Sequence, residues 1–155
     1  MNLIEIVRKY QDEILDKGIL VEYELFFNQV VENCCKFAID ENGELETLNN
    51  VINKLISKDK NAEIYVNTYS MDFEQENIYI YADSFWIDTM LSSEEISDLF
   101  KKFRKVEPTD IVSLLKDETI DGTVALVIFE DGTIENYRSF IGRKEFSKIK
   151  SLYWD

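Results

Sequence analysis

The fold is decided most directly by residues 123–138, which read TVALVIFEDGTIENYR. The first half of this stretch is a continuous apolar run, the second half is rich in strand-forming residues, and Glu130-Asp131-Gly132 joins them. An Asp-Gly pair supplies the positive φ that a tight hairpin turn needs, so the stretch predicts a β-hairpin. Because the first strand is apolar on both faces, we expect it to lie centrally in a sheet, with both faces covered.

Two further runs rich in β-branched and aromatic residues, 62–69 and 77–82, predict a second pair of strands. Their connector is short, so the two strands should pair antiparallel. Successive side chains of a strand point to opposite faces. In the second run, the side chains expected to face the helices are Ile78, Ile80 and Ala82, and those expected to face outward are Tyr79, Tyr81 and Asp83. We expect residues 84–89 to continue this strand after a bend.

Apolar residues recur at helical spacing in five other segments, which predict helices over residues 2–17, 21–38, 44–58, 92–105 and 142–152. The fourth of these opens with Ser92-Ser93-Glu94-Glu95, which matches a capping box. Residues 22–27 are also compatible with the start of a strand, and residues 109–115 fit either a short helix or a strand. The order of elements predicts an α+β fold: an antiparallel sheet of about 4–6 strands with helices packed against it, three helices preceding the first strands and one at the C-terminus.

The whole chain, residues 1–155, is predicted to form a single domain. A chain of this length buries about two-thirds of the surface that its unfolded form exposes, and five glycines and one proline leave no room for a disordered linker. The N-terminus has no basic region followed by an apolar run, and the apolar runs elsewhere are too short to cross a bilayer. We therefore expect a cytoplasmic protein that makes no membrane contact.

The chain contains no histidine. This absence removes Ser-His-Asp and Cys-His catalysis, histidine-ligated zinc and histidine-based pH sensing. The two cysteines, Cys34 and Cys35, are adjacent, which suits neither a structural disulfide nor a thiolate zinc site, so we expect them on the buried face of a helix. Glycine-rich phosphate-binding loops and Cys-x-x-Cys pairs are also missing, and the sequence predicts no cofactor.

The net charge of −14 is distributed unevenly along the chain. Residues 1–39 hold 7 acids and 4 bases, residues 40–98 hold 14 acids and 3 bases, and residues 99–155 hold 10 of each. The middle segment therefore carries most of the net negative charge. Such a field repels nucleic acid and anionic lipid and attracts basic proteins, so a basic protein partner is expected and a nucleic acid is not.

The densest run of aromatic residues lies in this acidic segment, at residues 79–88 (YIYADSFWID). Tyr and Trp supply rigid contact area in interfaces, and carboxylates pair with Arg or Lys, so the run predicts a partner-binding surface. The residues assigned to that surface are Tyr79, Tyr81, Asp83, Trp86, Asp88, Asp72 and Glu74. Two alternatives stay open: the aromatic residues could pack in the core, or Asp83 and Asp88 could combine with Asp72, Glu74 or Asp121 into a cation site or an acid–base pair.

These features favour three functions. The first is a non-enzymatic acidic binding protein that neutralises a basic protein partner. In size, charge, α+β make-up and lack of catalytic motifs the chain is similar to the small acidic immunity proteins that bacteria pair with their own toxins; the similarity covers no motif and implies no residue roles. The second function is a carboxylate-dependent or metal-assisted enzyme. The third is an interaction or assembly module, self-association included, whose charge serves solubility.

Overall fold

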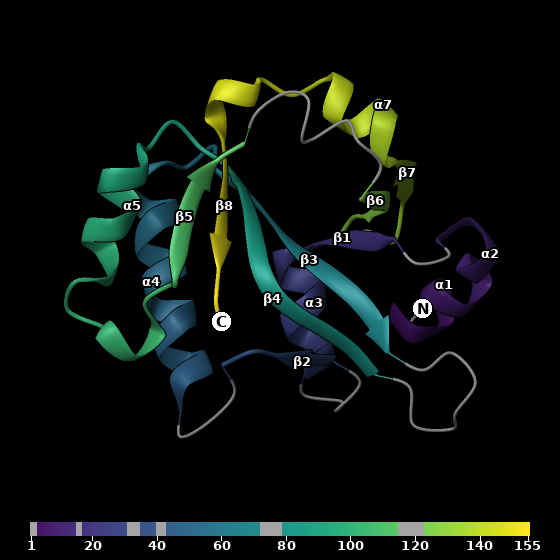
Figure 1. Ribbon diagram of the computed structural model, residues 1–155, viewed down its shortest axis with the longest axis horizontal. Helices are drawn as coiled ribbons and strands as arrows, with labels where there is room; N and C mark the ends of the chain where they lie inside the picture. Colours follow the sequence, from purple (N-terminus) through teal and green to yellow (C-terminus); the bar gives the residue numbers. More distant parts are fainter. Residues whose placement is uncertain (1–2, 15–16, 31–34, 40–42, 72–78, 115–122) are drawn as a thin grey trace.

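The computed structural model describes residues 3–14, 17–30, 35–39, 43–71, 79–114 and 123–155 (Figure 1). The α-helices are α1 (Leu3–Lys9), α2 (Gln11–Ile14), α3 (Tyr23–Val30), α4 (Glu44–Lys58), α5 (Ser93–Phe100) and α7 (Tyr137–Gly142). The strands are β1 (Gly18–Glu22), β2 (Cys35–Phe37), β3 (Glu63–Met71), β4 (Tyr79–Asp88), β5 (Asp110–Ser113), β6 (Val124–Ile128), β7 (Ile134–Asn136) and β8 (Ile149–Tyr153). Two 3₁₀ turns, η1 (Arg104–Val106) and η2 (Phe146–Lys148), complete the elements of the described ranges.

The eight strands form one mixed sheet, whose main path runs β5-β8-β4-β3-β1-β6-β7. Strand β2 pairs with the first half of β4, and β8 pairs with the second half. The pairs β1–β6 and β2–β4 are parallel, and the other pairs are antiparallel. The predicted α+β class is therefore right, but the predicted sheet of about 4–6 strands is too small, and the helices are interleaved with strands rather than three of them preceding the sheet.

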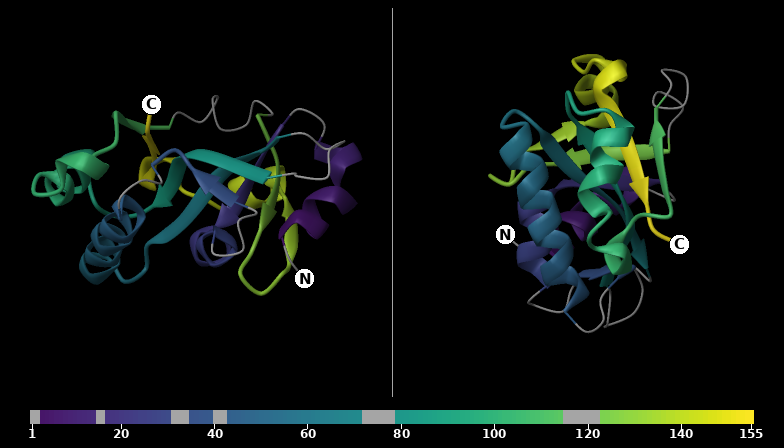
Figure 2. Two further views of the ribbon diagram at one scale, coloured as in Figure 1. Left: turned by 90° about the horizontal axis from the view of Figure 1, so that it is seen from below. Right: turned by 90° about the vertical axis from the view of Figure 1, so that its left-hand side faces the viewer.

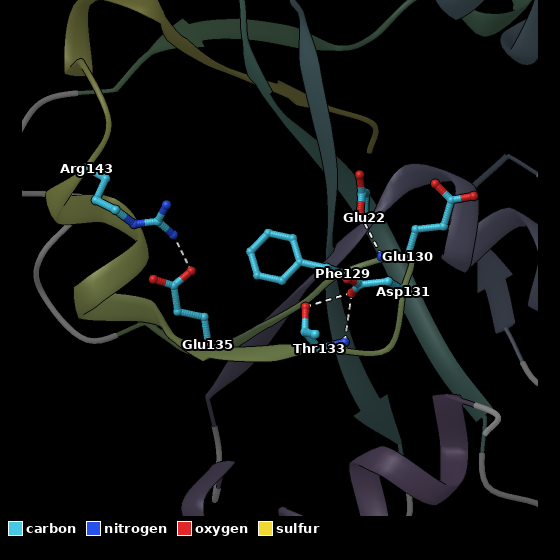
Figure 3. Close-up of a pocket in the computed structure, with 7 residues that line it drawn as sticks. All are labelled: Glu22, Phe129, Glu130, Asp131, Thr133, Glu135 and Arg143. Atoms are coloured by element: carbon cyan, nitrogen blue, oxygen red, sulfur yellow. Dashed lines mark hydrogen bonds and ion pairs between the residues drawn. The ribbon is translucent and has the colours of Figure 1, made fainter.

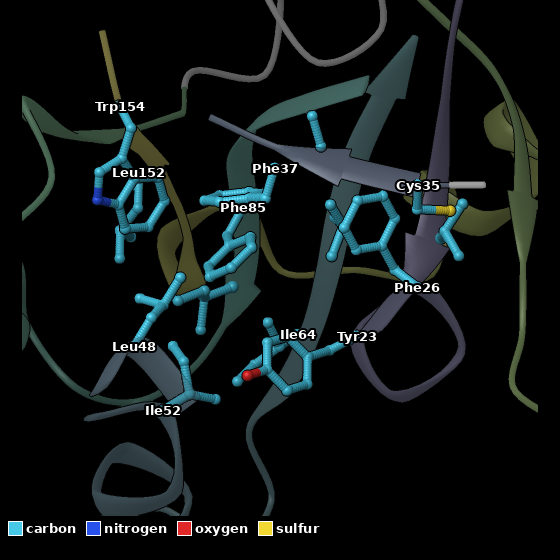
Figure 4. Packing of buried hydrophobic residues seen from close by; sticks show 14 of the residues in the cluster. Tyr23, Phe26, Cys35, Phe37, Leu48, Ile52, Ile64, Phe85, Leu152 and Trp154 are labelled. Carbon is cyan, nitrogen blue, oxygen red and sulfur yellow. The ribbon is translucent and has the colours of Figure 1, made fainter. Parts of the chain in front are cut away.

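The sheet separates two hydrophobic clusters. The larger cluster lies on the face covered by α1, α3, α4 and α5, here called the first face; α3 and α4 stand behind the strands in Figure 1. Aromatic rings dominate its centre, as Figure 4 shows for Tyr23, Phe26, Phe37, Phe85 and Trp154. The smaller cluster lies on the opposite, second face, where helix α7 packs on buried side chains of β1, β3, β4 and β6 (Figure 2).

The hairpin of residues 123–138 is confirmed. Strands β6 and β7 are antiparallel, and Gly132 in the connecting turn adopts φ +87°, a left-handed conformation that glycine takes without strain. Strand β6 lies between β1 and β7 with Val127 and Ile128 fully buried, as expected for a central strand.

Helix α4 and the capped start of α5 are also confirmed. The Ser92 hydroxyl accepts a 3.1 Å hydrogen bond from the Glu95 amide, and the Glu95 carboxylate accepts one of 3.1 Å from the Ser92 amide. Helix α5 ends at Phe100, earlier than predicted, and the short turn η1 follows it.

The predicted helix over residues 21–38 is wrong. This region begins with the end of β1, continues as α3 and ends in β2. Strand β1 lies between β3 and β6, so Ile19, Leu20 and Val21 are all buried, and a strand buried on both faces shows no alternation by which to recognise it. The predicted helix over 2–17 is realised as α1 and α2, and β1 begins directly after it, at Gly18.

The cysteine prediction is right about burial and wrong about the element. Cys35 is buried, but it lies in β2 rather than on a helix. Cys34 lies outside the described residues.

The predicted C-terminal helix over residues 142–152 is wrong as well. Helix α7 ends at Gly142, and the chain closes with β8, which pairs with β4 on one side and β5 on the other. Ile149 and Leu152 are three residues apart, as on one helix face, yet they lie in different clusters because neighbouring side chains of a strand alternate. The ambiguous residues 109–115 supply β5, the partner of β8.

None of the helices in the described ranges is long and apolar enough to cross a membrane.

Candidate functional site

A bulge in β4 decides which of the predicted site residues share a face. Asn67 of β3 lies opposite Ser84, and the next residue, Thr68, lies opposite Ala82, so Asp83 is left without a partner on β3. The extra residue shifts the alternation by one position. Ala82 and Phe85 consequently both point to the first face, and the second half of β4 turns its even-numbered side chains to the second face.

The prediction for the first half of β4 agrees with this geometry. Ile80 and Ala82 are fully buried on the first face, and Tyr81 and Asp83 are half-buried. Tyr79 lies in β4, but its side chain, Ile78, Asp72 and Glu74 are outside what the structure describes.

Trp86 and Asp88 lie on the half of the second face that α7 covers. Trp86 is 8% exposed and packs edge-on against the Tyr137 ring, with 5.7 Å between centroids. The Asp88 carboxylate lies 3.4 Å from Lys144 Nζ, and the side chains are 20% and 12% exposed. Both residues belong to the packing of the second cluster, which leaves little of either side chain for a partner.

No helix of the described ranges packs on the other half of the second face, which carries tyrosines and carboxylates. Tyr69 and Tyr153 are 41% and 40% exposed, among the few large hydrophobic side chains of the described chain that reach this exposure. Tyr69 lies opposite Tyr81 in the β3–β4 pair, and Tyr153 lies opposite Ser84, next to the bulge, in the β4–β8 pair. We call this set the tyrosine–aspartate surface; its members are Asn67, Tyr69, Tyr81, Asp83, Tyr153 and Asp155.

The end of β8 is held in place from the first face. The Trp154 ring packs against Phe37 and Phe85 at centroid distances of 5.3 and 4.9 Å, and its Nε1 donates a 2.9 Å hydrogen bond to the Val106 carbonyl. The Trp154 amide also donates to the Asp83 carbonyl at 2.8 Å, in the bulge. Because Trp154 points to the first face, its neighbours Tyr153 and Asp155 point to the tyrosine–aspartate surface.

Two carboxylates, Asp83 and Asp155, dominate the electrostatics of this surface, and Lys36 of β2 lies on the same face, opposite Tyr81. Burial raises the pKa of the Asp83 carboxyl and the charge of Asp155 raises it further, against hydrogen bonds from the Asp83 amide and the Ser84 hydroxyl that lower it. Asp155, burial and Asp83 raise the pKa of Tyr153, and burial and Asp83 raise that of Tyr69. Within the described ranges, no Lys or Arg nitrogen lies within 4.0 Å of either carboxylate.

Gly18, on the neighbouring strand β1, leaves space for the Asn67 side chain of the tyrosine–aspartate surface. A Cβ on Gly18 would lie 2.8 Å from Asn67 Oδ1 and 3.4 Å from the Tyr69 ring, closer to the amide oxygen than van der Waals contact allows. Asn67 Nδ2 donates a 3.2 Å hydrogen bond to the Tyr69 hydroxyl. The buried Oδ1 of Asn67 accepts no hydrogen bond from the described part of the chain.

Sequence reasoning missed Asn67, Tyr69, Tyr153 and Asp155. A signal existed for the last two: the C-terminal residues SLYWD alternate between polar or tyrosine side chains and Leu152 or Trp154, as in a strand with one open face.

A second feature is a broad depression of about 810 Å³ beside the β6–β7 turn (Figure 3). Its lining residues are Glu22, Phe129, Glu130, Asp131, Thr133, Glu135 and Arg143. Such a carboxylate-lined hollow is what the enzyme hypothesis expects, but three of the four carboxylates are engaged within the protein. Figure 3 shows Glu22 accepting from the Glu130 amide at 2.6 Å, Asp131 accepting from Thr133, and Glu135 paired with Arg143.

Asp131, whose side chain is hydrogen-bonded within the turn, is not poised as an acid. Hydrogen bonds from the Thr133 hydroxyl and amide lower the pKa of Asp131, the opposite of the shift that a general acid near neutral pH needs. Over the residues that the structure describes, no group of three or more Asp, Glu, Cys or His side chains is arranged to hold a metal ion. The tyrosine–aspartate surface is therefore the stronger candidate site.

Comparison of the chain with protein-family models, with curated proteins and with solved structures finds no match.

Proposed function

We propose that this protein is a non-enzymatic binding protein that neutralises a basic protein partner, as toxin-immunity proteins do, and that it docks through the tyrosine–aspartate surface. The observation that carries the proposal is the half-open second face of the sheet. There, Tyr69 and Tyr153 are exposed beside Asp83 and Asp155, and no Lys or Arg nitrogen of the described ranges lies within 4.0 Å of either carboxylate.

The chemistry of this surface suits a basic protein. Tyrosine offers a large, rigid contact area at low conformational-entropy cost, and carboxylates at an interface select cationic partners. The net charge of −14 adds long-range attraction, which speeds the encounter with a positively charged protein. The surface rests on strands rather than on loops, so it is held in one shape before binding.

The test is capture of the partner from the native host with the wild-type protein and three charge-reversal variants. Asp83→Lys and Asp155→Lys change the tyrosine–aspartate surface. Glu46→Lys is the matched control, because Glu46 is exposed on α4, which covers the opposite face. We expect a basic protein to bind the wild type and the control, and to be lost or slowed at least about tenfold in association with either aspartate variant.

Two results would contradict the proposal. Recovery of only acidic or neutral proteins would point to the assembly function, and equal losses for the control and the aspartate variants would show that net charge, rather than this surface, attracts the partner.

A further inference from the structure

We infer that the tyrosine–aspartate surface recognises an arginine side chain of the partner, with the guanidinium stacked on tyrosine and bonded to the Asp83 carboxylate. The inference rests on the proposed function and names the group that the surface selects. It follows from a comparison of the two halves of the second face. Both halves carry carboxylates and aromatic rings, but within the described ranges a lysine pairs with the carboxylates only in the covered half.

The covered half contains its own cation. Lys144 Nζ lies 5.0 Å from the centroid of the Phe140 ring and 5.8 Å from that of Tyr65, and it pairs with Asp88 and Glu63. Two carboxylates and two aromatic rings thus surround one positive charge. Cation–π attraction and ion pairing act together there, in a site that is mostly withdrawn from water.

The open half has the same kinds of group, but there no Lys or Arg nitrogen of the described ranges lies within 4.0 Å of the Asp83 or Asp155 carboxylate; Lys36 of β2 lies on the same face, opposite Tyr81. Burial raises the pKa of Asp83 and the charge of Asp155 raises it further, and Tyr153 lies close enough to both carboxylates for them to raise its pKa. If a neutral partner buried this surface, the two carboxylates would lose their contact with water without gaining a counter-ion, which is unfavourable. A partner that supplies a positive charge between the carboxylates and the rings would complete the arrangement that Lys144 completes in the covered half.

Arginine fits the acceptors of this surface better than lysine does. A guanidinium is planar, stacks on aromatic faces and offers five N–H donors in a fixed fork. The surface supplies a carboxylate from Asp83 and phenol oxygens from Tyr69 and Tyr153, which are acceptors spread across one face of the sheet. A lysine ammonium, a compact point charge, would reach fewer of them.

The test uses two defined peptides, acetyl-hexa-arginine amide and acetyl-hexa-lysine amide, which carry the same charge. Calorimetry gives the affinities, and amide chemical shifts of residues 67–69, 81–84 and 153–155 locate the binding. We expect the arginine peptide to bind at least about tenfold more tightly than the lysine peptide. Asp83→Asn should cancel most of this preference, whereas Glu46→Gln on α4 should leave it unchanged.

Tyrosine substitutions separate stacking from charge. Tyr153→Phe keeps the ring and should keep most of the preference, whereas Tyr153→Ala should reduce it severalfold. If Asp83→Asn does not fold, Asp155→Asn serves in its place. Equal affinity for the two peptides, or shifts located on other residues, overturns the inference.

The proposed function and this inference fail separately. If the peptides bind equally while capture still loses the partner on Asp83→Lys, the surface docks a basic protein without selecting arginine. If the arginine preference is measured but no basic protein is captured, the recognition chemistry stands and the proposed function fails.

Discussion

Two aspartates of β4 should respond in opposite directions to the same substitution. Asp88→Asn removes a carboxylate from the Lys144 pair, in which the side chains are only 20% and 12% exposed. Breaking a fully buried ion pair costs about 3–5 kcal/mol, and Glu63 remains as a second partner of Lys144, so we expect a loss of about 1–2 kcal/mol in the free energy of unfolding. Asp83→Asn removes a charge that nothing in the described chain balances, and we expect a gain of up to about 1 kcal/mol at neutral pH.

The pH dependence of the free energy of unfolding gives the sign of the stability change expected for Asp83→Asn. Because the folded state raises the pKa of this carboxyl, its ionisation disfavours folding at pH values above that pKa. As the pH falls below it, the wild-type carboxyl becomes protonated, and the stability difference between Asp83→Asn and the wild type should shrink toward zero. Urea unfolding followed by far-UV circular dichroism at several pH values measures the difference. A loss of stability for Asp83→Asn at neutral pH would refute the assignment of Asp83 as an unbalanced charge.

Three further predictions concern the framework of the surface. Trp154→Ala removes a buried indole and its hydrogen bond to the Val106 carbonyl, and should lower the free energy of unfolding by about 4 kcal/mol in urea titrations. Gly18→Ala should cost about 1–3 kcal/mol by overpacking, whereas Gly142→Ala, where a Cβ meets nothing within 4 Å, should change thermal stability little. Trp86 and Trp154 report on opposite faces, so in each single-tryptophan protein the fluorescence midpoint should coincide with that protein's own far-UV circular dichroism midpoint if residues 1–155 form one cooperative domain. Separate midpoints within one protein would reveal two units.

The elements that the sequence predicts well are those specified by neighbouring residues. Gly132 in its Asp-Gly turn, the Ser92 capping box and the apolar stripe of α4 all act within a few positions of the chain, and each is found in the structure. The turn and the capping box need no tertiary contact, and the apolar stripe of α4 repeats at the helical period within one segment, so all three patterns can be recognised in one sequence.

Strands β1 and β8 were missed because distant pairing creates them. Leu20 pairs with Asn67 on one side and with Val127 on the other, and Leu152 pairs with Phe85 and Ile111. Their apolar residues at spacings of three also satisfy a helical pattern. Only the presence of unpaired neighbouring strands decides between the two conformations, and a sequence pattern does not contain that information.

The candidate site was predicted in part for the same reason. Tyr81 and Asp83 were assigned from the density of aromatic and acidic residues, and the structure places them on the open half of the second face. The bulge at Asp83 and the position of α7 put Trp86 and Asp88 under cover. Tyr153 joins the surface only through the β4–β8 pairing, at a sequence separation that no local pattern spans.

The bulge is also the reason why the tyrosine–aspartate surface has a negative charge at its centre. In a regular strand Asp83 would have a partner residue on β3, but here its carbonyl accepts from the Trp154 amide and its side chain lies beside Tyr153 and Asp155. A carboxylate held there lowers the stability of the free protein, whereas an asparagine would fit the same geometry without the charge. A less stable residue at a half-buried position of a strand is expected where the charge acts in binding, and the opposite responses of Asp83 and Asp88 test this explanation independently of any partner.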